Sequence, residues 1–262
     1  MKKQHNNHLF YFLCLTLIIT SVFFYSCKNL DKNKTTNALA KTARAVTLTD
    51  SEIEQYAKEY IVYSDNENRL CNPSDANQKK YIDRMQKIIG SANTLNGKTL
   101  DIKVYYSQTQ NAFACANGSI RIYSGLMDIM SDDELFGIVG HEIGHISNKD
   151  TKEAFRKALL TSAILSAVGS TGKTAGALTD SQLGKLAEAY SQAQFSQKQE
   201  YAADDYGYSY LKQYKKNPKA MASALRNLQK LYDGQQNDKS KLQQMFSTHP
   251  EAGKRAERLE KK

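Results

Sequence analysis

The sequence predicts an α+β protein that is mainly α-helical and contains one small sheet of three strands. Between residues 99 and 124, hydrophobic residues alternate with polar ones in short runs, which is typical of strands. Elsewhere hydrophobic residues recur every three or four positions, which is typical of helices that bury one face. A chain of 262 residues, 40% of them hydrophobic, can fill a single packed domain, which we place at residues 47–262.

The first 26 residues have the pattern of an export signal. Two lysines precede a hydrophobic run from Leu9 to Phe24, and Ser26-Cys27 follows. A small residue before a cysteine resembles the site at which bacterial lipoproteins are cleaved and lipidated. We therefore predict a lipid on Cys27 and a flexible polar tether over residues 27–46. The alternative is an uncleaved anchor helix, for which the run is slightly short. Both readings tether an exported domain to a membrane.

Helices are predicted both before and after the strand region in the sequence. The first begins at a capping box, Thr49-x-x-Glu52, and the second follows a turn at Asn72-Pro73. Inside the sheet region, Asn117-Gly118 favours a tight hairpin turn. After the sheet, the helical pattern covers residues 131–148, about 151–168, 180–214, 218–232 and 250–260.

Residues 159–178 are hydrophobic but interrupted by three glycines. The segment is too short and too interrupted for a membrane-spanning helix. We expect a helix that passes into a mobile loop, and the alternative is a lid or a membrane-contacting segment.

Charge and cysteine content narrow the partners and the compartment. The net charge of +9 comes from basic residues scattered along the chain, which favours a solvated surface over a nucleic-acid groove. Cys14 lies within the export signal, so only Cys71 and Cys115 remain as free thiols of the exported domain. In an oxidising compartment they could form a disulfide, worth about 4 kcal/mol for a loop of roughly 45 residues. Two unrelated buried thiols are the alternative.

The chemistry is concentrated in GIVGHEIGHISNKD, residues 137–150. The preceding SDDE is a capping box that begins a helix, so this segment lies on a helix. His141 and His145 are one turn apart and can share one metal ion, while Glu142 can reach a water on that ion without binding it. This is the HExxH arrangement of zinc proteases, with the glutamate as the catalytic base. The alternative is a pair of histidines that binds no metal and is either exposed to solvent or hydrogen-bonded within the core.

A catalytic zinc needs a third protein ligand, and the segment QFSQKQEYAADDYGYSYL offers one on a second helix. Glu200 is the candidate. Asp204 lies one turn further along the same face and could accept the outer N–H of a ligating histidine. The alanines between them would let this helix approach the first closely. The residues alone leave Glu188 and Asp205 open as ligands, and a solvated acidic face as the alternative.

Three segments together resemble a known family. NAFACANGSIRIYSGLMDIMSDDELFGIVGHEIGHISNKD, then QFSQKQEYAADDYGYSYL, then FSTHP are similar to the HtpX and CAAX-prenyl-protease class of zinc metallopeptidases, and most similar to its periplasmic lipoprotein branch. The likeness spans roughly residues 47–260. It implies a gluzincin-type fold with a small sheet beside the HExxH helix, one Zn²⁺ per chain, and Glu200 as the third ligand.

The resemblance also bears on His249. The stretch Ser247-Thr248-His249-Pro250 is a plausible helix start with proline in the first turn. The family resemblance instead implies that His249 lies near the metal, either as a regulatory fourth ligand or as a group that stabilises the oxyanion.

These residues predict a membrane-anchored zinc metalloendopeptidase on the periplasmic side of a bacterial membrane, with the outer membrane as the expected one. Zinc would acidify a water and Glu142 would take its proton. The substrate backbone would add as a strand along the sheet edge at Ala112, Phe113 and Ala114. This mode reads few side chains and suits unfolded or misassembled envelope proteins. The rival prediction is a zinc-containing chaperone or assembly factor with little proteolysis.

Overall fold

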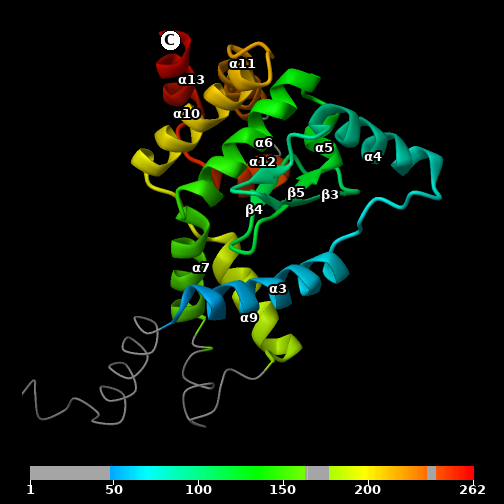
Figure 1. Cartoon of the computed structure of the whole chain (residues 1–262), viewed down its shortest axis with the longest axis vertical. Coiled ribbons are helices and arrows are strands. Elements are labelled where there is room, and N and C mark those ends of the chain that lie inside the picture. Colours follow the sequence, from blue (N-terminus) through cyan, green and yellow to red (C-terminus); the bar gives the residue numbers. More distant parts are fainter. Residues whose placement is uncertain (1–47, 163, 165–176, 235–239) are drawn as a thin grey trace, which may run out of the picture.

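The fold is α+β and mainly helical, as predicted (Figure 1). The computed structural model describes residues 48–162, 164, 177–234 and 240–262. The predicted signal, lipidation site and tether, and most of residues 159–178, lie outside the described residues. No helix in the described part of the chain combines the length and hydrophobicity needed to cross a bilayer. The elements in chain order are α3 (Asp50–Glu67), α4 (Ala76–Ile89), β1 (Thr94–Leu95), β2 (Lys98–Thr99), β3 (Asp101–Tyr105), β4 (Ala112–Ala114), β5 (Ser119–Tyr123), α5 (Ser124–Met127), α6 (Asp132–Ser147), α7 (Asp150–Thr161), α9 (Asp180–Ser191), α10 (Gln197–Gln213), α11 (Ala220–Gly234), α12 (Ser240–Thr248) and α13 (Ala252–Glu260).

The main sheet has three strands in the order β3-β5-β4. β4 pairs with β5 antiparallel through the predicted hairpin, where Gly118 adopts a φ of +88° and the Asn117 side chain accepts from the amide of Ser119. β3 pairs with β5 in parallel. This leaves β4 as an edge strand, and β4 packs against α6. The structure also contains a short β1–β2 hairpin, turned at Asn96-Gly97, which the sequence analysis did not predict.

Helices α6 and α10 pack backbone against backbone because small residues line their contact. A methyl group added at Gly144 would lie 2.9 Å from Cβ of Tyr206 and 3.0 Å from Cα of Ala203. One added at Gly207 would lie 2.9 Å from the carbonyl oxygen of Gly137. No larger side chain fits at these crossings without displacing a helix. The close approach brings the first turn of α10 next to the last turns of α6.

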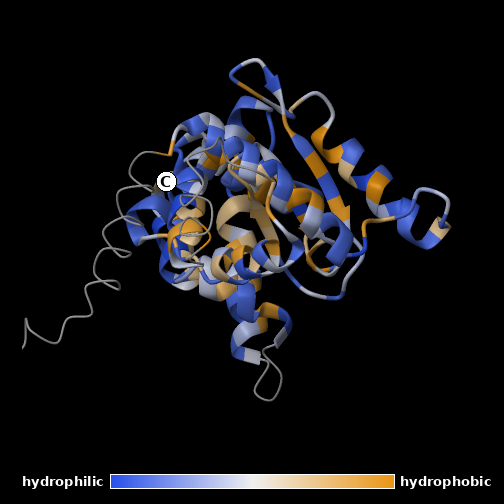
Figure 2. Ribbon diagram, turned by 90° about the horizontal axis from the view of Figure 1, so that it is seen from below, coloured by the Kyte–Doolittle hydropathy of each residue, from blue (hydrophilic) through white to orange (hydrophobic). Residues whose placement is uncertain are grey.

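Two hydrophobic clusters enclose the sheet and α6. The larger one joins α4, the sheet and α6 to α10, α11 and α13, and the smaller one joins α3, α7 and α9. In Figure 1 the second group of helices lies below the sheet and α10, α11 and α13 lie above it. Figure 2 shows hydrophobic and hydrophilic bands alternating along α4, as expected for a helix that buries one face.

A buried cation joins α3 to the sheet. Arg121 on β5 is fully buried and donates to Asp65 of α3 at 2.7 and 2.9 Å and to the Asp101 carboxylate at 2.8 Å. Burial alone would raise the pKa of Asp65, but the bonds from Arg121 and Tyr105 outweigh it and lower that pKa. The hydrogen bonds between Arg121 and Asp65 therefore fix the position of α3 against the strands.

The predicted single helix over residues 180–214 is wrong, because the chain breaks between α9 and α10. Ser196 forms a capping box with Gln199 and begins α10. Just before it, the amide of Phe195 donates to the carbonyl of Thr248 at 3.2 Å. The sequences of α9 and α10 both have helical periodicity, so the periodicity alone did not reveal the break between them. The hydrogen bond from Phe195 to Thr248 holds the chain in a non-helical path there. Helix α12 was also not predicted.

The predicted disulfide between Cys71 and Cys115 is not formed, and both thiols are free and buried. Cys71 lies outside β3, where Leu70 bridges to Tyr105, whereas Cys115 directly follows β4 at the opposite edge of the sheet. Three strand spacings of about 4.8 Å separate those positions, well beyond the roughly 7 Å that a disulfide spans. Burial raises the pKa of Cys71 to about 11 and that of Cys115 to about 12. Two unrelated buried thiols are therefore what the structure contains.

Candidate active site

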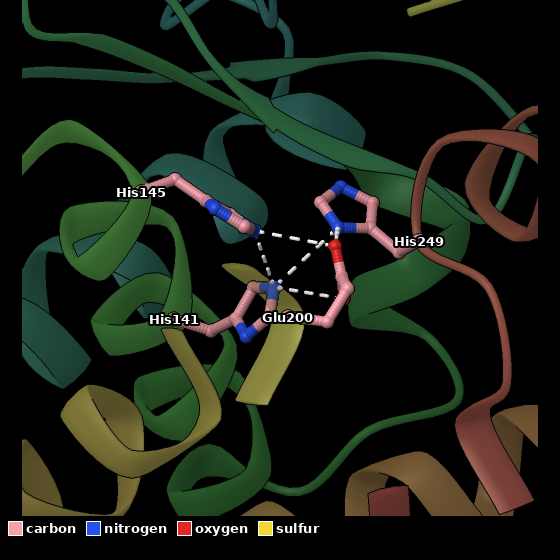
Figure 3. A group of neighbouring side chains, drawn as sticks. All are labelled: His141, His145, Glu200 and His249. Atoms are coloured by element: carbon pink, nitrogen blue, oxygen red, sulfur yellow. Dashed lines mark hydrogen bonds and ion pairs between the residues drawn. The ribbon is translucent and has the colours of Figure 1, made fainter. Parts of the chain in front are cut away.

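Four side chains from three separate parts of the chain converge on one point (Figure 3). His141 and His145 project from α6, Glu200 from α10, and His249 follows α12. One ligand atom from each lies within 4.8 Å of all the others, and all four residues are buried. The convergence depends on the α6–α10 contact, which places the first turn of one helix opposite the HExxH turn of the other.

The spacing of these atoms suits a tetrahedral zinc ion. The Nε2 atoms of His141 and His145 are 3.0 Å apart, and Glu200 Oε1 lies 3.4 Å from His145 Nε2. His249 Nδ1 lies 3.0 Å from the same carboxylate oxygen and 3.4 Å from His141 Nε2. Four ligands at zinc bond lengths of 2.0–2.1 Å lie about 3.4 Å from one another. The nitrogen and carboxylate donors are also those that zinc prefers, so the residues fit the ion.

Each histidine of the HExxH pair is oriented by a carboxylate behind it. Asp204 Oδ1 lies 3.0 Å from His141 Nδ1, and Asp150 Oδ2 lies 2.9 Å from His145 Nδ1. These bonds hold the proton on Nδ1 and turn the Nε2 lone pair toward the shared point. The ring of Phe195 stacks on His145 with the ring centroids 4.0 Å apart, which fixes the plane of that imidazole.

The pKa shifts favour the metal-binding forms of His141 and Glu200 but not that of His145. Burial lowers the pKa of His141 below its usual value, and the hydrogen bond with Asp204 offsets this only in part. Burial alone would raise the pKa of Glu200, but His249 and Arg255 outweigh it and hold that pKa well below its usual range. For His145 the bonds to Asp150 and Glu200 outweigh burial and raise the pKa to about 9. A metal ion at Nε2 of His145 would therefore have to displace a proton at neutral pH.

Arg255 on α13 is a buried cation beside this cluster, and the sequence analysis did not single it out. Its side chain donates to both oxygens of Asp204, at 2.6 and 2.9 Å, and also contacts Glu200. Burial would raise the pKa of Asp204, but Arg255 outweighs it and that pKa falls to about 2. The guanidinium thus keeps Asp204 ionised and holds it against His141.

Glu142 and His249 share a cavity next to the cluster. The cavity has a volume of about 320 Å³ and is also lined by Ala114 of the edge strand and by Tyr190 of α9. Nε2 of His249 lies 3.8 Å from Glu142 Oε1. The buried Glu142 is not one of the four converging residues, so its carboxylate stands beside the cluster and faces a space that can hold part of another molecule.

The other acidic candidates lie elsewhere. Asp205 faces away from the cluster and pairs with Arg258 and Lys262 at the surface. Glu188 lines the cavity but is not among the converging residues. Ala112, Phe113 and Ala114 form β4, the edge strand beside α6, as predicted.

The sequence analysis missed two residues of the site, and only the first of them could have been found from its spacing. Asp150 lies five positions after His145, where the chain turns out of α6, and a carboxylate there could be tested as a partner for that histidine. Arg255 lies six positions after His249, but nothing local distinguishes it from the exposed basic residues that surround it in the sequence.

A helix that carries HExxH, with a carboxylate oxygen from a second helix 3.4 Å from a histidine Nε2, defines a metallopeptidase site. The chain belongs to peptidase family M48, whose family profile matches residues 75–262. It is 36% identical to metalloprotease LoiP of Escherichia coli K12, with 89% of each chain covered. It is 30% identical to metalloprotease YcaL of the same strain, covering 94% of this chain and 95% of that protein.

More distant relatives include an HtpX protease homologue of Salinibacter ruber, which is 30% identical over 57% of this chain and 63% of that protein. The predicted family is therefore confirmed, and the protein is a zinc-dependent metalloprotease.

Proposed function

We propose that this protein is a membrane-anchored zinc endopeptidase that cleaves unfolded or misassembled proteins of a bacterial cell envelope. The observation that carries the proposal is the convergence of His141, His145 and Glu200 beside a cavity that is lined by Glu142. These three side chains would hold one zinc ion, His141 and His145 through Nε2 and Glu200 through its carboxylate. When bound, the ion supplies Lewis-acid chemistry that acidifies water and polarises a peptide carbonyl.

Glu142 is the proposed general base and acid. Its carboxylate would accept the proton of the attacking water and return it to the leaving amine. His249 presents Nε2 toward Glu142 and the cavity, where an imidazole N–H can donate to the oxygen that becomes negative as the carbonyl is attacked. Its Nδ1 faces Glu200, so the same ring could instead serve as a fourth ligand before substrate enters.

The proposed substrate class follows from the edge strand. β4 has a partner on one side only within the sheet, so an extended peptide could pair with its free side next to Glu142. Main-chain pairing selects for an available strand rather than for a particular sequence. A folded protein does not offer such a strand, whereas an unfolded or misassembled one does.

We expect purified protein to cut reduced, unfolded casein-type substrates and to stop when a chelator removes the metal. Activity should return when zinc is added back, because the four-residue cluster is the only group in the described residues with metal-ligand geometry. Fragments would be followed by gel electrophoresis and mass spectrometry, and the zinc content by atomic absorption. Suppressed aggregation of the unfolded substrate without any fragments would favour the chaperone alternative and contradict the endopeptidase.

The proposed anchor is the lipid on Cys27, at the periplasmic side of a membrane and most simply the outer membrane. The support is the hydrophobic run from Leu9 to Phe24, which is followed by Ser26-Cys27. We expect Cys27→Ser to release the protein from the membrane fraction and to abolish labelling by a radioactive fatty acid. Unchanged fractionation of the variant would instead indicate the uncleaved anchor helix.

A further inference from the structure

The free side of β4 offers few groups to a pairing strand. The carbonyl of Asn111 accepts from the amide of Tyr123 at 3.0 Å, and the amide of Cys115 donates to the carbonyl of Ser119 at 2.8 Å. Residues 111, 113 and 115 therefore turn their backbone groups toward β5. Because these groups alternate along an antiparallel strand, Ala112 and Ala114 turn theirs to the free side. A substrate strand would pair with these two residues.

One of the two outward carbonyls already has a donor. The hydroxyl of Tyr190, from the last turn of α9, donates to the carbonyl oxygen of Ala114 at 2.8 Å. Both residues line the same cavity as Glu142 and His249. The hydroxyl thus occupies the position that a substrate amide would take if it paired with Ala114.

Tyr190 is held in this position by its surroundings. Its side chain is 8% exposed, and its ring makes edge contacts with Tyr60 and Phe155 at centroid distances of 5.4 and 5.2 Å. Burial, with smaller contributions from Cys115, Tyr60 and Glu142, raises its pKa well above the usual value, so the hydroxyl keeps its proton and remains a donor. A substrate amide at Ala114 would have to displace a buried hydroxyl and leave it without a partner.

We propose that Tyr190 limits how far a substrate strand pairs with the enzyme, by occupying the outward carbonyl of Ala114. This inference rests on the proposed binding of substrate along β4. A substrate residue that faces Ala114 finds this carbonyl already bonded, so its own amide gains no main-chain hydrogen bond there. The enzyme therefore recognises a short extended segment on that side of the cleavage point, and the chain beyond it diverges from the sheet.

The test is a ladder of fluorogenic peptides, extended one residue at a time on either side of a fixed cleavage point. In the wild type, KM should stop falling at the length that reaches Ala114. In Tyr190→Phe the carbonyl is freed, so on one side of the cleavage point the next extension should lower KM by roughly 3- to 10-fold relative to the shorter peptide. The measured quantity is this ratio of KM values, which does not depend on the absolute activity of the variant.

Tyr105→Phe is the matched control. It also removes one buried hydroxyl, which bonds Asp65 at 2.7 Å, but Tyr105 does not line the cavity. Its KM ratio should equal that of the wild type. Peptide affinity measured by fluorescence anisotropy in the Glu142→Gln background, with and without Tyr190→Phe, gives the same comparison without turnover.

Three outcomes would overturn the inference. The first is an unchanged KM ratio in a folded Tyr190→Phe protein. The second is a wild type whose KM keeps falling with every added residue on both sides. The third is an equal loss of kcat on all peptides, which would mean that the hydroxyl acts on the reacting atoms. Each outcome leaves cleavage of unfolded protein measurable in the wild type, so it is distinguishable from failure of the proposed function, in which no peptide is cut.

Discussion

Replacing Glu142 by glutamine is expected to lower kcat by about 10²- to 10⁴-fold while the protein keeps its zinc. The amide has the same shape as the carboxylate but cannot take a proton from water at neutral pH. Zinc binding should survive because Glu142 is not one of the four residues whose ligand atoms converge. The measurement is cleavage of an unfolded protein and of a fluorogenic peptide, with zinc content determined on the same preparation.

Glu67→Gln is the control for this substitution. Glu67 is exposed at the end of α3 and is not among the residues that line the cavity. The same chemical change there should leave both kcat and zinc content at wild-type values. Retained cleavage by a pure Glu142→Gln protein would remove the glutamate from the mechanism. Loss of zinc from that variant would instead make it a ligand, in disagreement with the geometry of the cluster.

The parts of the site that the sequence predicted are those that lie within one helix. The capping box at Ser131 and the helical spacing of His141 and His145 are local, so the sequence places both imidazoles on one face of α6. The same holds for β4, whose place next to the Asn117-Gly118 turn marks it as one strand of a hairpin. Each of these depends on residues a few positions apart.

The parts that the sequence could not decide depend on packing between distant segments. Glu200 and Asp205 are both acidic residues of α10, yet one faces α6 and the other pairs with surface cations. That difference is set by the rotation of α10 in its glycine-lined contact with α6. The disulfide prediction failed for a related reason, because the strand order β3-β5-β4 and the bridge from Leu70 to Tyr105 put Cys71 and Cys115 at opposite edges of the sheet.

The cluster also depends on the positive charge of Arg255, whose burial the neighbouring sequence does not reveal. The carboxylates of Glu142, Glu200 and Asp204 are all buried. Arg255 is the buried cation that contacts two of them, and it is 2% exposed. Asp204 in turn bonds His141, so the guanidinium acts on the metal site through Asp204 as well as through its direct contact with Glu200.

Arg255→Met should therefore lower the free energy of unfolding of the chelator-treated protein by about 3–5 kcal/mol, because it leaves Asp204 and Glu200 buried without their shared cation. Arg255→Lys should lose less, since an ammonium keeps the charge but cannot bond both oxygens of Asp204 as the planar guanidinium does. Urea unfolding followed by circular dichroism measures both.

Arg258→Met is the matched comparison on the same helix. Arg258 pairs with Asp205 in a partly exposed ion pair, with side chains 27% and 42% exposed, so its loss should cost under about 1 kcal/mol. Both substitutions remove one positive charge, so a difference between their losses of unfolding free energy reports the effect of burial. Equal losses in the two methionine variants would mean that Asp204 and Glu200 find compensation without Arg255, and the orientation of His141 would then have to come from the α6–α10 contact alone.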